Sequence, residues 1–409
     1  MSVYLRRIID LGPGGVVYPG SAHDYRYHGN RTYFAETRTP WVRLWADWPS
    51  LQPDPAFAPD DPDGPGYPRL QALDEQIAAA CADGVSVLLL PYRFPLWAND
   101  TTALGLQRNT DAEISFAYWD RISPSSWARY VESGRDPTRY NPSRRALEFR
   151  IPPEGVGPGS AWARFFAFLY GRYHRGRRAS GRWVEGFELV NEPNWQLWPQ
   201  RGPSTTGDAF APGPPAVQET VAQLLLTAQA ISARHGHSTL MLAPSAADSE
   251  ASGRTVTPYD EFTANLLDAM DAAGYRPHAQ QAWAHHNYTD LERRDTNTRT
   301  QAVRRLLTGR WAGYAEGAGP TVFITEGGAR TTRMRSYYPG EDPLQAQADS
   351  MRLGWDRHAT DDGAGAGVAM LAQYQTYADP RFDSGLLDPW PAVVRRPIYD
   401  VWASLPRHP

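Results

Sequence analysis

Two glutamates in this chain each close a short apolar run. Glu192 ends residues 187–192 and is followed by Pro193, and Glu326 ends residues 322–326 and is followed by two glycines. Apolar and β-branched residues favour strands, while Pro and Gly stop them, so both carboxylates are predicted at the tips of buried strands. Two such carboxylates could cleave a glycosidic bond, one protonated to donate to the leaving oxygen and the other ionised to attack the anomeric carbon.

Short apolar runs alternate with longer helical patterns along the chain, which predicts repeated βα units around a parallel sheet. The predicted strands are residues 13–18, 41–47, 85–91, 184–191, 239–243, 280–286, 321–326 and 366–373. The helical patterns fall at residues 70–82, 160–175, 215–235, 259–273, 298–313, 343–358 and 396–404. Eight such units in 409 residues predict an α/β fold of the (β/α)8 TIM-barrel type, with residues 1–409 forming a single domain.

The surplus length falls into two insertions, residues 92–158 after the third predicted strand and residues 193–214 after the fourth. Both would enlarge loops of the C-terminal face, where the active sites of this fold are built. The alternative is that the insertions are decorative or form an oligomer contact. Trp195 and Trp198 lie in the second insertion, and because aromatic faces stack on sugar rings, both are predicted substrate contacts.

Aromatic residues make up 12 % of the chain, with 15 Trp and 21 Tyr. We expect several further Trp side chains to lie in loops and to suit a sugar-binding cleft, namely Trp45, Trp48 and Trp97. The competing interpretation is that these rings simply pack in the core or on the surface.

Around Asn191, Glu192 and Pro193 the sequence resembles the retaining glycoside hydrolases of clan A, the superfamily that holds the cellulase-like family 5 and the xylosidase-like family 39. The resemblance extends over nearly the whole barrel. It implies that Glu192 at the fourth strand is the acid/base and that Glu326 at the seventh strand is the nucleophile. It also implies that Asn191 donates to the sugar 2-hydroxyl, an interaction that strengthens in the transition state.

Further matches follow in chain order, and the resemblance implies that these residues bind substrate. Arg43 on the second strand would lie near the nucleophile and favour its ionised form, unless it is a surface residue at a strand start. His286 and Tyr288 match a His-x-Tyr pattern at the sixth strand, where the Tyr hydroxyl bonds the nucleophile. The eighth strand lacks the Trp whose side chain usually forms the floor of the sugar-binding site, and Gln373 or Tyr374 stands in its place.

Two further ionisable residues are interpreted as structural. Glu188 lies deeper on the fourth strand than Glu192 and is predicted to be a buried structural carboxylate. His285 points to the opposite face of its strand from His286, so the two histidines cannot chelate one ion together. Neither a metal nor a cofactor is therefore predicted.

Composition bears on partners and location. The formal net charge of −4 gives no electrostatic case for nucleic acid or an anionic membrane, and no apolar run reaches the roughly 18 residues of a membrane span. The first residues lack the pattern of a secretion signal, so a cytoplasmic enzyme is the simplest expectation, although a chain whose leader had been removed would look the same. Every basic residue is Arg and none is Lys, which excludes Schiff-base chemistry on lysine.

We expect double displacement through a covalent glycosyl-enzyme on an oligosaccharide or small glycoside, with the two carboxyl groups about 5–5.5 Å apart. Two alternatives stay open: a transglycosylase that uses the same two glutamates, and a barrel that only binds carbohydrate. A metal-dependent barrel enzyme is disfavoured, because no convergent set of His, Asp and Glu ligands stands at the strand ends. The sequence specifies neither the sugar and its linkage nor the oligomeric state.

Overall fold

The structure is a computed structural model that describes residues 5–98, 153–195, 198, 217–251, 256–311, 321–360 and 367–406, apart from residues 28, 279, 296–297, 309, 380–381 and 392. Most of the two predicted insertions, residues 92–158 and 193–214, lies outside the described residues. The described ranges contain all eight strands of the predicted barrel.

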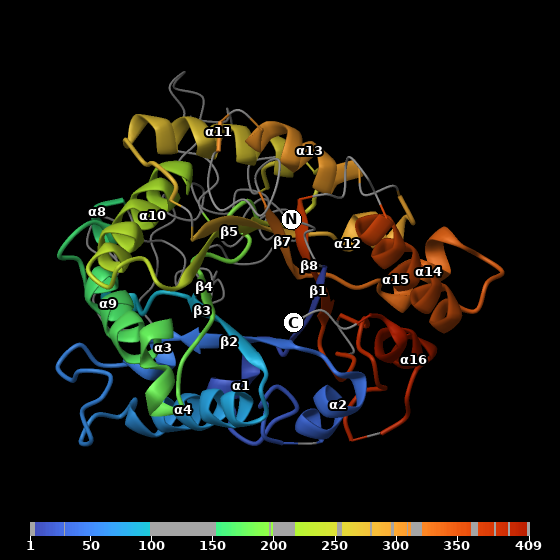
Figure 1. Cartoon of the computed structure of the whole chain (residues 1–409), viewed down its shortest axis with the longest axis horizontal. Helices are drawn as coiled ribbons and strands as arrows, with labels where there is room; N and C mark the ends of the chain where they lie inside the picture. Colours follow the sequence, from blue (N-terminus) through green and yellow to red (C-terminus); the bar gives the residue numbers. More distant parts are fainter. Residues whose placement is uncertain are drawn as a thin grey trace, which may run out of the picture.

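Eight parallel strands form a closed barrel in sequence order, and the last strand pairs back onto the first (Figure 1). The strands are β1 (Arg6–Asp10), β2 (Trp41–Asp47), β3 (Ser86–Tyr92), β4 (Gly186–Glu188), β5 (Leu240–Ala246), β6 (Gln281–His286), β7 (Val322–Glu326) and β8 (Val368–Tyr374). The predicted (β/α)8 TIM barrel is therefore confirmed.

Helices surround the barrel and cover the outer side of its wall in Figure 1. The described α-helices are α1 (Gly14–Val17), α2 (Asn30–Thr37), α3 (Trp48–Leu51), α4 (Tyr67–Ala82), α8 (Pro153–Val156), α9 (Ala161–Tyr173), α10 (Val217–Ala233), α11 (Tyr259–Ala272), α12 (Tyr288–Glu292), α13 (Thr298–Leu307), α14 (Thr331–Tyr337), α15 (Pro343–Thr360) and α16 (Pro397–Ser404). The described 3-10 helices are η1 (Leu96–Ala98) and η3 (Arg175–Ser180). Each helical pattern predicted from the sequence corresponds to one of the longer α-helices.

The barrel wall is buried on both faces, which explains why its strands appear in the sequence as continuous apolar runs rather than alternating ones. Every residue of β2, β5, β6 and β7 is buried. Large rings fill the layer between strands and helices: Trp48 stacks on Phe165 with ring centroids 4.7 Å apart, and Trp162 stacks on Phe166 at 5.2 Å. This packed wall fixes the strand ends that carry the side chains of the site.

The predicted first strand, residues 13–18, is wrong: β1 is Arg6–Asp10, and Gly14–Val17 form the short helix α1. The cause is Arg7, whose charge makes β1 look polar in the sequence although its side chain is buried. The Arg7 guanidinium donates to the backbone carbonyls of two residues that are distant in the sequence, which satisfies the buried cation. Because such partners leave no local pattern, the more apolar segment that follows looks like the better strand.

Three tryptophans expected in loops lie in or against regular structure. Trp45 lies on β2, and Trp48 begins α3, because β2 continues directly into that helix without a loop. Both side chains are buried. Trp97 lies in η1 and packs edge-on against Trp48, with ring centroids 5.5 Å apart. The loop expectation is therefore wrong for Trp45 and Trp48.

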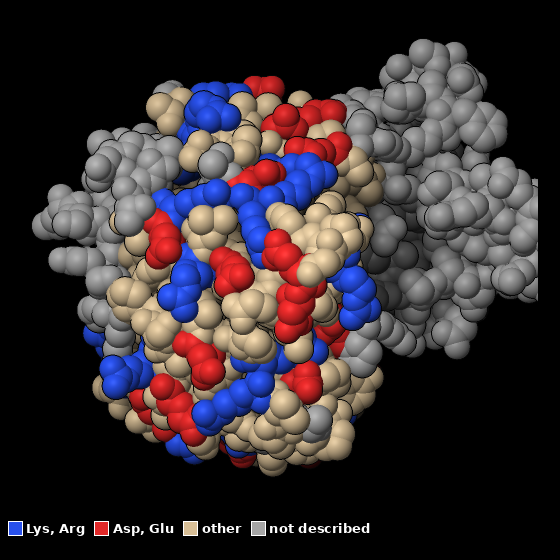
Figure 2. Space-filling model, turned by 90° about the vertical axis from the view of Figure 1, so that its right-hand side faces the viewer, with Lys and Arg blue, Asp and Glu red and all other residues tan. Residues whose placement is uncertain are grey.

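The surface carries charges of both signs. Arginine and acidic side chains are interspersed across the face shown in Figure 2, which agrees with the formal net charge of −4. This face therefore presents no uniform field to a polyanion. Among the described helices, none has both the length and the apolar character needed to cross a bilayer.

Candidate active site

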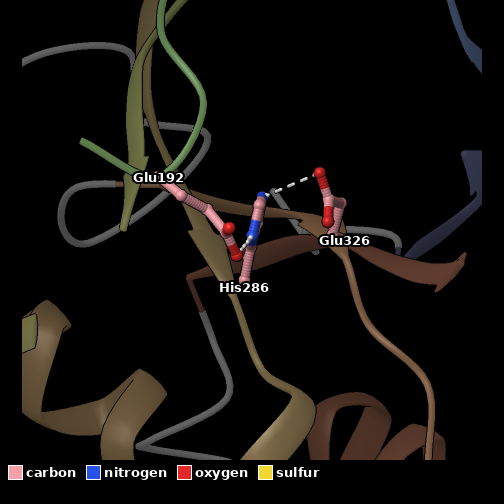
Figure 3. A group of neighbouring side chains, drawn as sticks. All are labelled: Glu192, His286 and Glu326. Atoms are coloured by element: carbon pink, nitrogen blue, oxygen red, sulfur yellow. Dashed lines mark hydrogen bonds and ion pairs between the residues drawn. The ribbon is translucent and has the colours of Figure 1, made fainter. Parts of the chain in front are cut away.

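The carboxyl ends of β4, β6 and β7 bring three ionisable side chains together: Glu192, His286 and Glu326 (Figure 3). One oxygen of each glutamate and a ring nitrogen of the histidine all lie within 4.8 Å of one another. In Figure 3 the imidazole of His286 lies between the two carboxylates. The two glutamates predicted to be catalytic therefore face each other at the C-terminal end of the barrel.

Glu192 is held beyond the end of β4 by a strained turn. Its φ is 44°, in the left-handed region, which costs a non-glycine residue about 1 kcal/mol or more. Asn191 forms a β-bridge with Ser245 of β5, and the Glu192 N–H donates to the Ser245 carbonyl at 2.9 Å. These backbone contacts hold the turn, which directs the Glu192 side chain toward His286.

Glu326 is the last residue of β7 and lies among hydrogen-bond donors. The Nη1 group of Arg43 donates to its Oε1, and the Tyr288 hydroxyl donates to its Oε2 at 3.0 Å. The Nε2 atom of His286 lies 3.7 Å from Oε1. A carboxylate that accepts bonds from a cation and a hydroxyl is stabilised in its ionised form.

His286 contacts both glutamates. Its Nδ1 lies 2.9 Å from Oε1 of Glu192, a distance at which the two groups can exchange a proton. Burial opposes the charged imidazolium, but the charges of Glu326 and Glu192 outweigh burial and raise the pKa of His286 above its ordinary value. The imidazole therefore couples the protonation of the two carboxylates.

Arg43 is fully buried and organises the carboxylates beneath the cavity. Its Nε and Nη2 donate to the two oxygens of Glu188 at 2.8 and 2.7 Å, while its Nη1 donates to both Asp10 and Glu326. Burial disfavours the guanidinium charge, yet these carboxylates hold the pKa of Arg43 well above its ordinary value. Arg43 is thus a partner of Glu326 and not a surface residue, and Glu188 is the buried carboxylate expected from the sequence.

Arg43 also orients the amide of Asn191. Its Nη2 donates to Asn191 Oδ1 at 2.8 Å. Because a guanidinium can only donate, the amide must present its oxygen to Arg43, and its NH₂ group then remains to donate to a ligand. The Asn191 backbone is held separately, since the Trp198 indole N–H donates to its carbonyl at 3.2 Å.

A cavity of about 670 Å³ opens above these residues. The aromatic side chains in its described lining are Trp45, Tyr92, Trp195, Tyr288, Tyr374 and Phe382. The charged side chains that accompany Glu192 and Glu326 in the lining are Asp248, Glu250, Glu292, Arg293, Arg330 and Arg333. A cavity that combines aromatic faces with fixed polar groups is suited to a sugar, which has apolar C–H faces and hydroxyl edges.

Four residues predicted to bind substrate are not in the described cavity lining, namely Arg43, His286, Trp198 and Gln373. Arg43 and His286 lie beneath the cavity and contact Glu326. Trp198 is buried and packs edge-on against Phe94, with ring centroids 5.7 Å apart. Gln373 is also buried, and its Nε2 donates to the Ser384 carbonyl at 2.6 Å. Both side chains bond to backbone behind the cavity wall, and Tyr374 is the β8 residue that lines the cavity.

Asp10 belongs to this site but is missed by the sequence interpretation. It ends β1 and lies in register with Arg43 on one side and Tyr374 on the other. Its Oδ1 accepts from the Gly12 N–H at 2.6 Å and from the Trp45 indole N–H at 2.7 Å. The sequence does carry a signal for Asp10. The apolar pair Ile8–Ile9 is followed by an acid and, two residues later, by a glycine, a pattern similar to the one at the end of β7. The misplaced first strand hides this signal.

The group of Glu192, His286 and Glu326 also has the spacing of metal ligands. However, the guanidinium of Arg43 already donates to Glu326, and a cation bound there would lie beside this buried positive charge. A guanidinium and a phenol facing one carboxylate suit a nucleophile better than a metal ligand. We therefore interpret the group in terms of nucleophilic and proton-transfer chemistry.

No protein-family model and no curated protein matches the chain. Solved structures do match. GH5_18 from Streptomyces cattleya in complex with GlcNAc aligns with a TM-score of 0.52 and 15 % identity, over 100 % of this chain and 83 % of that chain. GH5_18 from Bifidobacterium longum subsp. infantis aligns with a TM-score of 0.54 and 12 % identity, over 98 % of this chain and 78 % of that chain.

A family 39 glycoside hydrolase from Bacteroides cellulosilyticus WH2 aligns with a TM-score of 0.51 and 13 % identity, over 98 % of this chain. This chain covers 63 % of that protein, less than two thirds of its length. Across nearly its whole length, the chain therefore shares the TIM-barrel fold of these glycoside hydrolases. At these identities the likeness establishes the fold, and the site must be judged from its own residues.

Proposed function

We propose that this chain is a retaining glycoside hydrolase that cleaves an oligosaccharide or a small glycoside by double displacement. The proposal rests above all on one observation: an oxygen of Glu192 and an oxygen of Glu326 lie within 4.8 Å of each other. Retaining enzymes have carboxyl groups about 5–5.5 Å apart, whereas inverting enzymes need about 6.5–9.5 Å to admit a water molecule between carboxylate and sugar. The short separation supports direct attack by one of the carboxylates.

Glu326 is the proposed nucleophile. In the first step one of its oxygens bonds to the anomeric carbon while the bond from that carbon to the leaving oxygen breaks. Glu192 gives its proton to the leaving oxygen, and a glycosyl ester forms on Glu326. The bonds from Arg43 and Tyr288 support this role, because they favour the ionised carboxylate and fix its orientation before the attack.

Glu192 is the proposed acid/base. Its side chain is 26 % exposed, against 7 % for Glu326, so a leaving group and then a water molecule can reach it. In the second step the Glu192 carboxylate takes a proton from water, the water oxygen bonds to the anomeric carbon, and the ester bond to Glu326 breaks. Two inversions at the same carbon give a product that keeps the anomeric configuration of the substrate.

A saccharide is the proposed substrate. The free NH₂ group of Asn191 can donate to a sugar hydroxyl, and the rings of Trp45, Tyr92 and Tyr374 supply faces for stacking. Two proteins of similar fold were solved with saccharides: GH5_18 from Streptomyces cattleya with GlcNAc, and a variant of GH5_18 from Bifidobacterium longum subsp. longum ATCC 55813 with Manb1-4GlcNAc. These complexes support a saccharide here without specifying which one.

Release of nitrophenol from a panel of nitrophenyl glycosides tests the proposal. The panel covers β-glucoside, β-xyloside, β-galactoside, α-L-arabinoside and disaccharide donors, and NMR follows the anomer that forms first. We expect release from at least one donor with retained configuration, loss of release in Glu326→Ala, and unchanged release in Glu36→Ala, which alters a surface ion pair with Arg395. A first product of inverted configuration, or no cleavage of any donor or of oligosaccharides, contradicts the proposal.

A further inference from the structure

Three buried carboxylates meet a single guanidinium at the floor of the cavity. Glu188 accepts from Nε and Nη2 of Arg43, while Asp10 and Glu326 both accept from Nη1. Full ionisation of the three acids would leave two uncompensated negative charges in this set, at a place where burial makes each of them costly. One of the carboxyl groups is therefore favoured to hold a proton.

The bonds around each acid indicate which one holds the proton. Glu188 accepts from two nitrogen atoms of Arg43 and from the Ser245 hydroxyl at 2.6 Å, so it is paired with the guanidinium through two bonds. Asp10 shares Nη1 with Glu326 and is completely buried. Burial is the largest influence on Asp10 and, with the charge of Glu326, raises the pKa of Asp10 to about 6 against the opposing effect of Arg43.

The other groups that face Asp10 come from β2, β6–α12 and β8. The Trp45 indole and the Gly12 amide donate to Asp10, and neither titrates. Burial and the charge of Glu326 hold the pKa values of Tyr288 and Tyr374 well above the ordinary value, so both phenols stay neutral. On the described elements around Asp10, the charged groups that remain are Arg43 and Glu326 and, beyond Glu326, His286.

We propose that Asp10 is a positioning residue that competes with Glu326 for Nη1 of Arg43 and thereby sets the pH range in which the nucleophile is ionised and aligned. The inference rests on the proposed function, because it assigns Asp10 a role in the reaction of Glu326. An ionised Asp10 places a second negative charge beside the nucleophile and opposes its ionisation. Protonation of Asp10 removes that charge, and Glu326 is then the only ionised acceptor of the Arg43 Nη1 group among the three buried acids.

The first test compares Asp10→Asn with wild type. Asparagine keeps the shape of the side chain and resembles the protonated acid, but it never carries a charge. We expect the fall in kcat/KM that accompanies ionisation of Asp10 near pH 6 to be absent from Asp10→Asn, which should keep its low-pH value of kcat/KM through neutral pH. Asp10→Ala should lower kcat as well, because the Gly12 and Trp45 N–H groups lose their acceptor.

Asp74→Asn is the matched control. Asp74 is also a buried aspartate that pairs with arginines, Arg172 and Arg182, but it lies on α4 away from the cavity. Asp74→Asn should lower stability and leave the change in kcat/KM near pH 6 as it is in the wild type. An Asp10→Asn profile that superimposes on the wild-type profile overturns the proposal, as does an equal change in the Asp74→Asn profile.

A second test needs no turnover and so separates this proposal from the proposed function. In protein labelled with ¹³C at the Asp carboxyl carbons, the resonance that disappears in Asp10→Asn belongs to Asp10. We expect this resonance to titrate near pH 6 in wild type and at lower pH in Glu326→Gln, which removes the neighbouring charge. Titration at the ordinary pH of an aspartate in both proteins overturns the coupling, whether or not any glycoside is cleaved.

Discussion

Glu192 and Glu326 face each other across one cavity, but the protein holds them in different ways. Glu326 ends a regular strand, is 7 % exposed, and accepts bonds from Arg43 and Tyr288. Glu192 lies past a strand end on a left-handed turn, is 26 % exposed, and contacts His286. Under the proposed mechanism, the carboxylate assigned to attack thus lies in the rigid wall among donors, and the carboxylate assigned to exchange protons lies at the edge, where water can reach it.

The adjacent histidines of β6 extend the same contrast. His286 points toward Glu192 and Glu326, whose charges overcome burial and raise its pKa. His285 points toward the helices and lies 6.1 Å from the Tyr259 ring. Burial lowers the pKa of His285 to about 3, and the positive charges of His286, His358 and Arg299 act in the same direction. Successive side chains of a strand point to opposite faces, so one strand carries a protonatable imidazole and a neutral one.

Replacing the proposed nucleophile should have the largest effect. Glu326→Ala removes the atom proposed to bond to the anomeric carbon, and we expect kcat to fall by on the order of 10⁴-fold or more for every donor. Added azide can occupy the vacated space and attack from the same side in a single displacement, so any glycosyl azide formed should have inverted configuration. The measurement is the initial rate together with the NMR assignment of the azide product.

Replacing the proposed acid/base should give a smaller effect that depends on the leaving group. Glu192→Ala should slow donors with poor leaving groups by about 10²- to 10⁴-fold and affect nitrophenyl donors much less in the first step. Azide should then replace water in the second step and give a glycosyl azide of retained configuration. If both alanine variants give azides of the same configuration, the assignment of different roles to Glu192 and Glu326 fails.

Removing one donor from Glu326 should sharpen the contrast further. A hydrogen bond to a charged group contributes about 1.5–3 kcal/mol, so Tyr288→Phe should lower kcat/KM about 10- to 150-fold. Tyr170→Phe is the control, because it removes a buried hydroxyl that bonds Ser232 outside the cavity lining. It should reduce the free energy of unfolding without changing kcat/KM. Equal kinetic losses in both variants would mean that Tyr288 acts only through stability.

The two glutamates could be placed from the sequence because each ends a strongly apolar run. Such runs report burial on both faces of a parallel barrel, and the predicted strands corresponding to β2 through β8 overlap the strands of the structure. Once the second strand is located, the position of Arg43 along it follows directly from the sequence. The part of the site that depends on the order of residues along strands was therefore predictable.

The remainder depends on contacts between residues that are distant in the sequence. Arg7 is buried because two remote carbonyls accept from it, and this concealed both β1 and Asp10 at its end. Trp198 and Gln373 were predicted to touch substrate from their residue types, but each turns to a backbone carbonyl behind the wall. Residue type and spacing indicate what a side chain can do, and the packed neighbours decide where it points.

The smallest expected effect concerns stability, and it starts with His285. Among the described residues neither of its ring nitrogens has a hydrogen-bond partner. Its folded pKa of about 3 lies below the ordinary 6.5, so its contribution to stability is present above pH 6.5 and is lost as pH falls below that value. The loss at pH 5 amounts to about 2 kcal/mol. His285→Leu should lose correspondingly less stability between pH 7 and pH 5 in urea unfolding.

His286→Gln should show the opposite sign. The raised pKa of His286 means that its pairing with Glu326 and Glu192 stabilises the folded protein below pH 6.5 and that this contribution fades as pH rises through the folded pKa. The difference in unfolding free energy between wild type and His286→Gln should therefore shrink on the alkaline side, whereas the difference for His285→Leu changes on the acid side. Asp10 is common to all three proteins, so its own titration largely cancels in these differences. Parallel pH profiles for the two histidine variants would mean that the two faces of β6 present the same electrostatic environment, and the contrast between His285 and His286 would then be wrong.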